Sequence, residues 1–196
     1  MKTFKTIFSV FLIFISGCET SSQFSDELPV RELSRTEKQI VSSADNFAFK
    51  LFKKIADEES DKNVFVSPLS ISMALGMTLN GAEGSTFEAM RNTLLLSGIT
   101  QQEINESYQS LIQHLTKMDS KVIMQIANSI WYRNTFPVKE SFIEINKKYF
   151  DATIKPTNFG DPSTVNIINN WVKEATNGKI DKIVERIDPA TIMFLI

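Results

Sequence analysis

The segment Pro68–Leu79, with the sequence PLSISMALGMTL, restricts the fold more than any other part of the chain. At helical spacing its apolar residues cover nearly the whole circumference: Ile71, Met73, Ala74, Leu75, Met77 and Leu79. A helix that is apolar all round has to be buried on all sides. Ser67 before it is a good N-cap, and Pro68 suits the first helical position. The sequence therefore predicts a central helix around which other elements pack.

Two hydroxyls, those of Ser67 and Ser70, stand one turn apart at the start of this apolar segment. A nucleophilic serine needs a base within reach, and the single histidine, His114, belongs to a different predicted helix. Neither serine is in a Gly-x-Ser-x-Gly elbow. We therefore interpret the pair as structural. Ser67 caps the helix, and Ser70 forms hydrogen bonds in a crowded interior, where an unpaired hydroxyl costs about 1–3 kcal/mol.

Helical and strand-like hydrophobic periods alternate along the rest of the chain. Amphipathic helical patterns occupy residues 44–60, 85–95, 100–119, 138–150 and 161–176. Runs rich in apolar and β-branched residues, which predict strands, occupy residues 64–66, 122–132, 152–159 and 191–196. Capping boxes at Ser85–Glu88 and Thr100–Glu103 mark two of the helix starts. Pro156 marks the third predicted strand as an edge strand or a strand end.

The composition excludes several classes of function. A net charge of −2, without a run of lysine and arginine, gives no electrostatic footprint for nucleic-acid binding. One histidine and one cysteine do not supply a zinc site or a disulfide framework. We therefore expect no metal, no cofactor, no nucleic acid and no small-molecule substrate.

The first residues predict an export signal. Two lysines precede the apolar run Ile7–Ile15, and the run is too short for a permanent membrane helix. The sequence ISGC, which ends at Cys18, resembles the lipobox of bacterial lipoproteins, in which the cysteine carries lipid. We interpret residues 1–17 as a lipoprotein signal peptide and residues 18–40 as a lipid-anchored tether. A plain signal peptide with an incidental cysteine is the alternative.

The segment Thr191–Ile196 closes the chain on an apolar strand without a polar tail. Domains rarely end inside such a strand, because its edge and its end need to be covered. The sequence is therefore expected to be the front part of a larger domain.

Three sequence blocks, in this order, resemble the serpin family of serine protease inhibitors. They are NVFVSPLSISMALGMTLNGAEGSTFEAM (residues 63–90), IANSIWYRNTFPVKESFIEINKKYFDATIKPTNF (residues 126–159) and INNWVKEATNGKIDKIV (residues 168–184). The similarity extends over residues 41–196, which would form the N-terminal portion of a serpin domain.

This resemblance implies an α+β serpin fold with helices like helices A–F of the family and a large central sheet, sheet A. On this mapping 122–132 and 152–159 are strands of sheet A, and 166–176 is the helix that lies across the sheet. The segment 191–196 begins the strand that borders the gap into which the reactive loop inserts. The chain is then expected to end inside a sheet strand.

The resemblance also implies a function and a set of structural residues. Inhibitory serpins are not enzymes: a target serine or cysteine protease cleaves their reactive loop and is trapped when the loop inserts into sheet A. The reactive loop lies outside these 196 residues. Ser67 and Ser70 match serines of the "shutter" beneath the insertion gap, and Asn169 is a further candidate for that region.

We therefore expect an exported, lipid-anchored serpin-type protease inhibitor that faces the periplasm or the cell surface, or the extracellular medium if it is released. Two alternatives stay open. One is a non-inhibitory serpin-like binding protein, and the other is a non-functional fragment.

Overall fold

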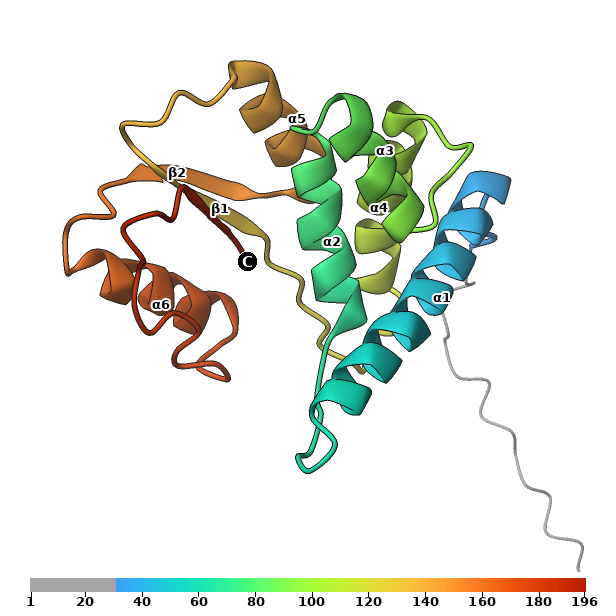
Figure 1. Ribbon diagram of the computed structural model, residues 1–196. Coiled ribbons are helices and arrows are strands. Elements are labelled where there is room, and N and C mark those ends of the chain that lie inside the picture. Colours follow the sequence, from blue (N-terminus) through green and yellow to red (C-terminus); the bar gives the residue numbers. More distant parts are fainter. Residues whose placement is uncertain (1–30) are drawn as a thin grey trace, which may run out of the picture.

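The computed structural model describes residues 31–196, and within this range it contains six helices and three strands (Figure 1). In chain order the elements are α1 (Arg35–Glu58), α2 (Pro68–Leu79), α3 (Gly84–Thr93), α4 (Gln101–Leu115), β1 (Ser129–Arg133), α5 (Glu140–Phe150), β2 (Thr153–Thr157), α6 (Thr164–Ala175) and β3 (Met193–Leu195). The α+β class is confirmed. The predicted signal peptide, Cys18 and the first part of the tether lie outside the described residues.

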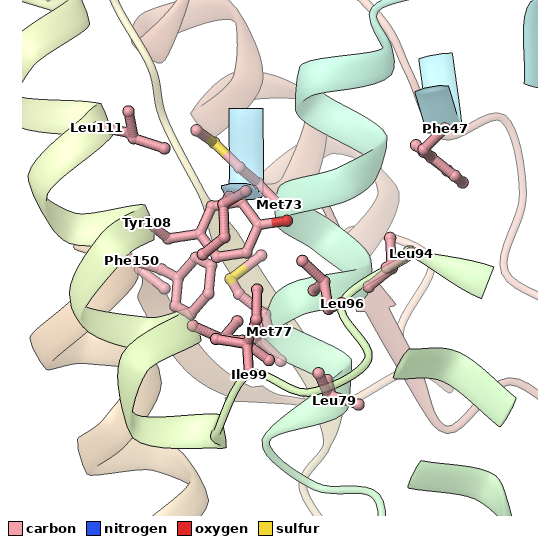
Figure 2. Close-up of a cluster of buried hydrophobic side chains, with 14 of the residues drawn as sticks. Phe47, Met73, Met77, Leu79, Leu94, Leu96, Ile99, Tyr108, Leu111 and Phe150 are labelled. Carbon is pink, nitrogen blue, oxygen red and sulfur yellow. The ribbon is translucent and has the colours of Figure 1, made fainter. Parts of the chain in front are cut away.

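Helix α2 lies at the centre of the larger core, as its sequence predicts. Met73, Met77 and Leu79 are almost fully buried. Figure 2 shows the two methionines beside Tyr108 of α4 and Phe150 of α5. A Cβ atom on Gly76 would lie 3.2 Å from both aromatic rings, so glycine lets these rings approach the backbone of α2.

The three strands form one sheet in the order β2-β1-β3, with β1 in the middle. Strand β1 runs parallel to β2 and antiparallel to β3. Alternate residues of β1 point to opposite faces. Ile130 joins the larger core with α2, whereas Trp131 joins a second core with α6. Figure 1 shows α2 and α6 on different sides of the strands.

Helix α1 begins nine residues before the predicted helix start at residue 44, at Arg35. Ser34 and Glu37 form a capping box there that our reading of the sequence overlooked. Ile40 is only 1% exposed. The assignment of residues 35–40 to the tether is therefore wrong, because an N-cap and an apolar contact with the core hold them in the helix.

One predicted capping box is confirmed and the other is wrong. In α4 the Glu103 N–H donates to Thr100 Oγ1 at 3.3 Å, and Thr100 N–H donates to Glu103 Oε2 at 2.9 Å. Helix α3 instead starts at Gly84, with Glu83 as N-cap and no side-chain capping bond. Ser85 therefore lies within the first turn of that helix and does not cap it.

The predicted strands 152–159 and 191–196 are confirmed as the shorter strands β2 and β3, and Pro156 lies on an edge strand. The predicted strand 64–66 is not formed, and only the end of 122–132 is a strand. Phe65 is fully exposed, and Ile123 is 90% exposed. The physical reason is that a strand needs a neighbour, and β2 and β3 lie only beside residues 129–133.

An ion pair between the partly exposed Arg31 and the buried Glu37 fixes the start of α1 near α4. The Arg31 guanidinium donates two hydrogen bonds to the Glu37 carboxylate, at 2.5 and 2.9 Å, and a third to Ser110 Oγ at 2.7 Å. Glu37 is only 4% exposed. The hydrogen bonds from Arg31 hold the pKa of Glu37 far below its ordinary value, and the opposing effect of burial is smaller.

We predict that this carboxylate makes the stability of the fold pH-dependent. Because the pKa of Glu37 is lower in the folded than in the unfolded chain, its ionised form stabilises the fold at neutral pH. This contribution is lost as the pH falls from the ordinary glutamate pKa of 4.5 toward the folded value. Glu37→Gln should lower the free energy of unfolding at neutral pH by about 1.5–3 kcal/mol and flatten its dependence on acid pH, as measured by urea titration.

Glu58→Gln is the matched control, because Glu58 lies on the same helix in an exposed ion pair with Lys54. Its effect should stay below about 0.5 kcal/mol. Equal pH profiles for the wild type and Glu37→Gln would contradict the prediction.

Candidate functional site at the start of α2 and the edge of the sheet

Ser67 and Ser70 lie together at the start of α2. The Ser67 side chain accepts the Ser70 N–H at 3.3 Å and caps the helix, with Pro68 at its first turn. The two hydroxyl oxygens are 2.8 Å apart, which is a hydrogen bond. The prediction that Ser67 is the N-cap is therefore confirmed.

The expectation that Ser70 lies in a crowded interior is wrong. Both serines are exposed, because no other segment within residues 31–196 covers this end of α2. The serines also have no base, since within the described residues neither is hydrogen-bonded to His114. The two serines cap the helix and expose two hydroxyl groups. They do not form a pair of nucleophile and base.

A buried polar contact that sequence reasoning missed continues from this helix start into the core. Ser72 is 2% exposed, and its hydroxyl donates to the carbonyl of Leu69 at 2.8 Å. The Tyr108 hydroxyl donates to the carbonyl of Ser72 at 3.4 Å. Burial raises the pKa of Tyr108, so this phenol stays a neutral donor. The only sequence signal for this buried polar contact is the alternation of small polar and apolar residues along α2.

Strand β3 borders the open side of the sheet. It pairs with β1 through Ile130↔Leu195, Trp131↔Phe194 and Tyr132↔Met193. No strand within residues 31–196 lies against its other edge. The opposite edge strand, β2, carries Lys155 and Pro156, which discourage further pairing. Strand β3 has neither a charge nor a proline, so its free edge can accept another strand.

Helix α6 covers the face of the sheet that points away from α2. Trp171 of α6 meets Trp131 of β1 edge to face, with ring centroids 6.1 Å apart. Phe159 and Phe194 pack in the same way at 5.6 Å. Ile168 is fully buried between them in the second core. The expectation that this helix lies over the sheet is confirmed.

Asn169 ties α6 to the connection that leads to β3. Its Oδ1 accepts the N–H groups of Ile183 and Val184, both at 2.9 Å, and its Nδ2 donates to the carbonyl of Val184 at 2.8 Å. The side chain therefore replaces a strand as the partner of this loop backbone. Asn169 is 8% exposed, so these bonds are protected from water.

The structure thus brings two of the three predicted shutter residues together. Ser67 and Ser70 share a hydrogen bond on α2, whereas Asn169 lies on α6, which packs in the second core on the other face of the sheet. A common shutter role for the three residues stays a prediction. Within residues 31–196 there is no cluster of three metal-ligating side chains.

Comparison with known proteins identifies a family. The family profile described as "Serpin (serine protease inhibitor)" matches residues 42–196. Serpin A3-2 of Bos taurus is 33% identical over 160 residues, which is 80% of this chain and 39% of the relative. Corticosteroid-binding globulin of Saimiri sciureus is 32% identical over 185 residues, 92% of this chain and 46% of the relative.

Solved structures show the same similarity. The thermophilic serpin tengpin in its latent state aligns with a TM-score of 0.73 and 37% identity, over 84% of this chain and 43% of that protein. Human thyroxine-binding globulin complexed with its hormone aligns with a TM-score of 0.75 and 31% identity, over 82% of this chain and 44% of that protein. The chain therefore spans about two fifths of the length of these relatives.

We predict that Asn169 holds the connection between α6 and β3 in place. Asn169→Ala should leave two N–H groups and a carbonyl without their partner and lower the free energy of unfolding by about 1–3 kcal/mol. Amide hydrogen exchange at Ile183 and Val184 should become faster. Asn170→Ala, at an exposed position on the same helix, is the control and should change neither quantity. Unchanged exchange at both amides in Asn169→Ala would disprove the assignment.

Proposed function

This chain belongs to the serpin family, and from this premise we propose that it is the N-terminal portion of a serpin-type inhibitor of serine endopeptidases. The full protein would act as a suicide substrate: its reactive loop is cleaved by the protease and inserts into the central sheet. The residues described here would supply the part of the sheet that receives the loop. Serpins are generally protease inhibitors and not enzymes.

The observation that carries this proposal is the free edge of β3. Strand addition requires a row of unpaired backbone groups on a rigid sheet, and side-chain pockets then give it specificity. Strand β3 is held on its other edge by β1, and the backbone pairing continues to Ser129 and Ile196 at 2.7 and 2.9 Å. An incoming loop would find an apolar strand with no charge or proline to exclude it.

Two further features support a sheet that opens. Ser67 and Ser70 form a local hydrogen bond with each other that does not tie α2 to the strands, so the sheet can move without breaking it. Helix α6 rests on the sheet through aromatic contacts, and its hydrogen bonds run to the 183–184 backbone. In our proposal α6 shifts with that loop, while Ser67 and Ser70 act as the shutter beneath the gap.

A second candidate function is that of a non-inhibitory binding protein on the same scaffold. The observation that favours it is the similarity to proteins named for what they bind, the corticosteroid-binding and thyroxine-binding globulins. In that case the reactive loop would not trap a protease. The two candidate functions share the fold. Only the formation of a covalent complex with a protease distinguishes the inhibitor from the binding protein.

The proposed place of action is the outside of a membrane. Residues 1–17 would direct export, and Cys18 would carry the lipid that anchors the domain. Within residues 31–196, no helix is both long and apolar enough to cross a bilayer. In this proposal the lipid on Cys18 attaches the protein, and the target protease is met at the cell surface or in the periplasm.

The inhibitory function is tested with the full-length product of the gene and with residues 1–196 alone. Each is incubated with an excess of trypsin-like, elastase-like or papain-like protease and separated on a denaturing gel. The full-length protein should give a covalent complex with at least one active protease and none with a protease whose nucleophile has been blocked. Residues 1–196 should give no complex, because they lack the loop. Cleavage without complex formation would favour the binding protein.

The anchor is tested by metabolic labelling with a radioactive fatty acid. Wild-type chain expressed in a bacterial host should incorporate the label and fractionate with membranes, because Cys18 supplies the thiol that is lipidated. Cys18→Ala should lose the label. As a control, Ser21→Ala changes a nearby residue of the proposed tether and should keep it. Equal labelling of Cys18→Ala and wild type would rule out the lipobox.

A further inference from the structure

Three asparagines and a glutamine form a network of carboxamides where α2 ends beside α4 and α5, with Asn80 and Gln101 partly exposed and the other two residues buried. Asn80 Nδ2 donates to Asn105 Oδ1 and to Asn146 Oδ1, both at 3.0 Å. Asn80 Oδ1 accepts from Gln101 Nε2 and from Asn105 Nδ2, both at 2.9 Å. Asn105 and Asn146 are 4% and 0% exposed. Asn80 is thus the centre of a polar junction between three helices.

The residue after Asn80 is Gly81, and packing explains why it is a glycine. A Cβ atom at this position would lie 3.0 and 3.1 Å from two carbons of the Phe142 ring. The φ angle of Gly81 is not in the left-handed region. Glycine is therefore required here because a side chain would not fit, and not because the backbone conformation is unusual. Two independent contacts, one polar and one apolar, therefore place an Asn-Gly pair at this junction.

An asparagine followed by glycine is chemically labile in a flexible chain, because no side chain shields the next backbone nitrogen. Asparagine is accordingly counted among the thermolabile residues. We propose that Asn80 is a deamidation site that the fold keeps closed, so that modification there accumulates with the time that the domain spends unfolded. This inference does not depend on the proposed inhibitory function.

The reaction balances with water as the only co-reactant. The deprotonated backbone nitrogen of Gly81 attacks Cγ of Asn80, a C–N bond forms, and the side-chain nitrogen leaves as ammonia. The resulting cyclic imide is then opened by water at either carbonyl, which gives aspartate or isoaspartate. No oxidant or reductant is involved, since an amide is exchanged for a carboxylate.

The folded structure blocks the first step at both reacting groups. The Gly81 N–H is engaged with the Thr78 carbonyl at 2.9 Å. The Asn80 carboxamide is held by four hydrogen bonds from three side chains, so it cannot turn its Cγ toward that nitrogen. In the unfolded chain both restraints vanish, and chemical modification of the unfolded state competes with refolding.

The product would not fit the network. A carboxylate at Asn80 would place its second oxygen against the acceptor oxygens of Asn105 and Asn146. Asn146 cannot flip to offer a donor, because its Nδ2 already donates to the carbonyls of Met77 at 3.3 Å and Phe142 at 3.0 Å. The buried acceptor oxygens of Asn105 and Asn146 would then face a partly buried charge. Deamidation would therefore make unfolding hard to reverse.

The chain contains a second Asn-Gly pair, Asn177-Gly178, which provides an internal control. Asn177 is exposed, and its carboxamide donates to the exposed Gln125 side chain. A carboxylate there would be hydrated, and no buried acceptor would face it. The glycine N–H is hydrogen-bonded in both pairs, since the Gly178 N–H donates to the Lys173 carbonyl at 2.7 Å. The two pairs therefore differ in how the asparagine carboxamide is held and in how far it is buried.

The first test follows both pairs in one wild-type sample by peptide mass mapping. The chain is incubated at mildly alkaline pH with and without denaturing urea, and the amide-to-acid mass shift is measured over time. Asn80 should react at least about tenfold more slowly in the folded chain than in urea, because reaction requires opening. Asn177 should show a smaller difference. Equal rates for Asn80 in both conditions would overturn the proposal.

The second test mimics the product with Asn80→Asp and Asn177→Asp in the full chain. Asn80→Asp should unfold at a clearly lower urea concentration than wild type, or fail to refold after dilution from urea. Asn177→Asp should refold like wild type. If Asn80→Asp refolds as completely as Asn177→Asp and is as stable, the network tolerates the carboxylate. The claim that deamidation at Asn80 makes unfolding hard to reverse would then be wrong. The mass-mapping result needs no variant and stands whether or not Asn80→Asp folds.

Discussion

The burial of α2 is the constraint on which the rest of this structure depends. Helices α1, α3, α4 and α5 all pack against this apolar helix, and Gly76 lets the rings of Tyr108 and Phe150 reach its backbone. The expected burial on all sides is not complete within residues 31–196, because Ile71, Ala74 and Leu75 are only partly buried. The sheet then packs on the same core through Ile130. The position of the strands, and therefore of the free edge of β3, follows from this one helix.

Polar side chains at a few buried positions decide how the helices sit relative to one another. Asn80 joins α2 to α4 and α5, and Asn169 holds the loop that leads to β3. Glu37 binds Arg31, which in turn donates to Ser110 of α4 and so fixes the start of α1. Helices held by apolar contacts alone can shift along one another. A buried hydrogen bond allows only one geometry, and breaking it costs free energy. These contacts fix the register that the apolar core leaves free.

The functional proposal depends on the surfaces that the described residues leave uncovered. The free edge of β3 and the exposed pair Ser67 and Ser70 suit a sheet that accepts a further strand. The chain spans about two fifths of its relatives' length. Those relatives include proteins named serpins as well as corticosteroid-binding and thyroxine-binding globulins.

The sequence alone determined that the helices exist, because helical periodicity and caps such as Ser67 and the Thr100–Glu103 box act over a few residues, although the starts of α1 and α3 differ from those predicted. It also identified the family. Tertiary structure decided the rest. Residues 122–127 have a strand-like sequence but pair with no strand within residues 31–196, and Ser70 is exposed because nothing described covers it. The partners of Asn80 and Asn169 are likewise distant in the chain. Pairing and burial depend on which distant segments meet, and local sequence does not encode that.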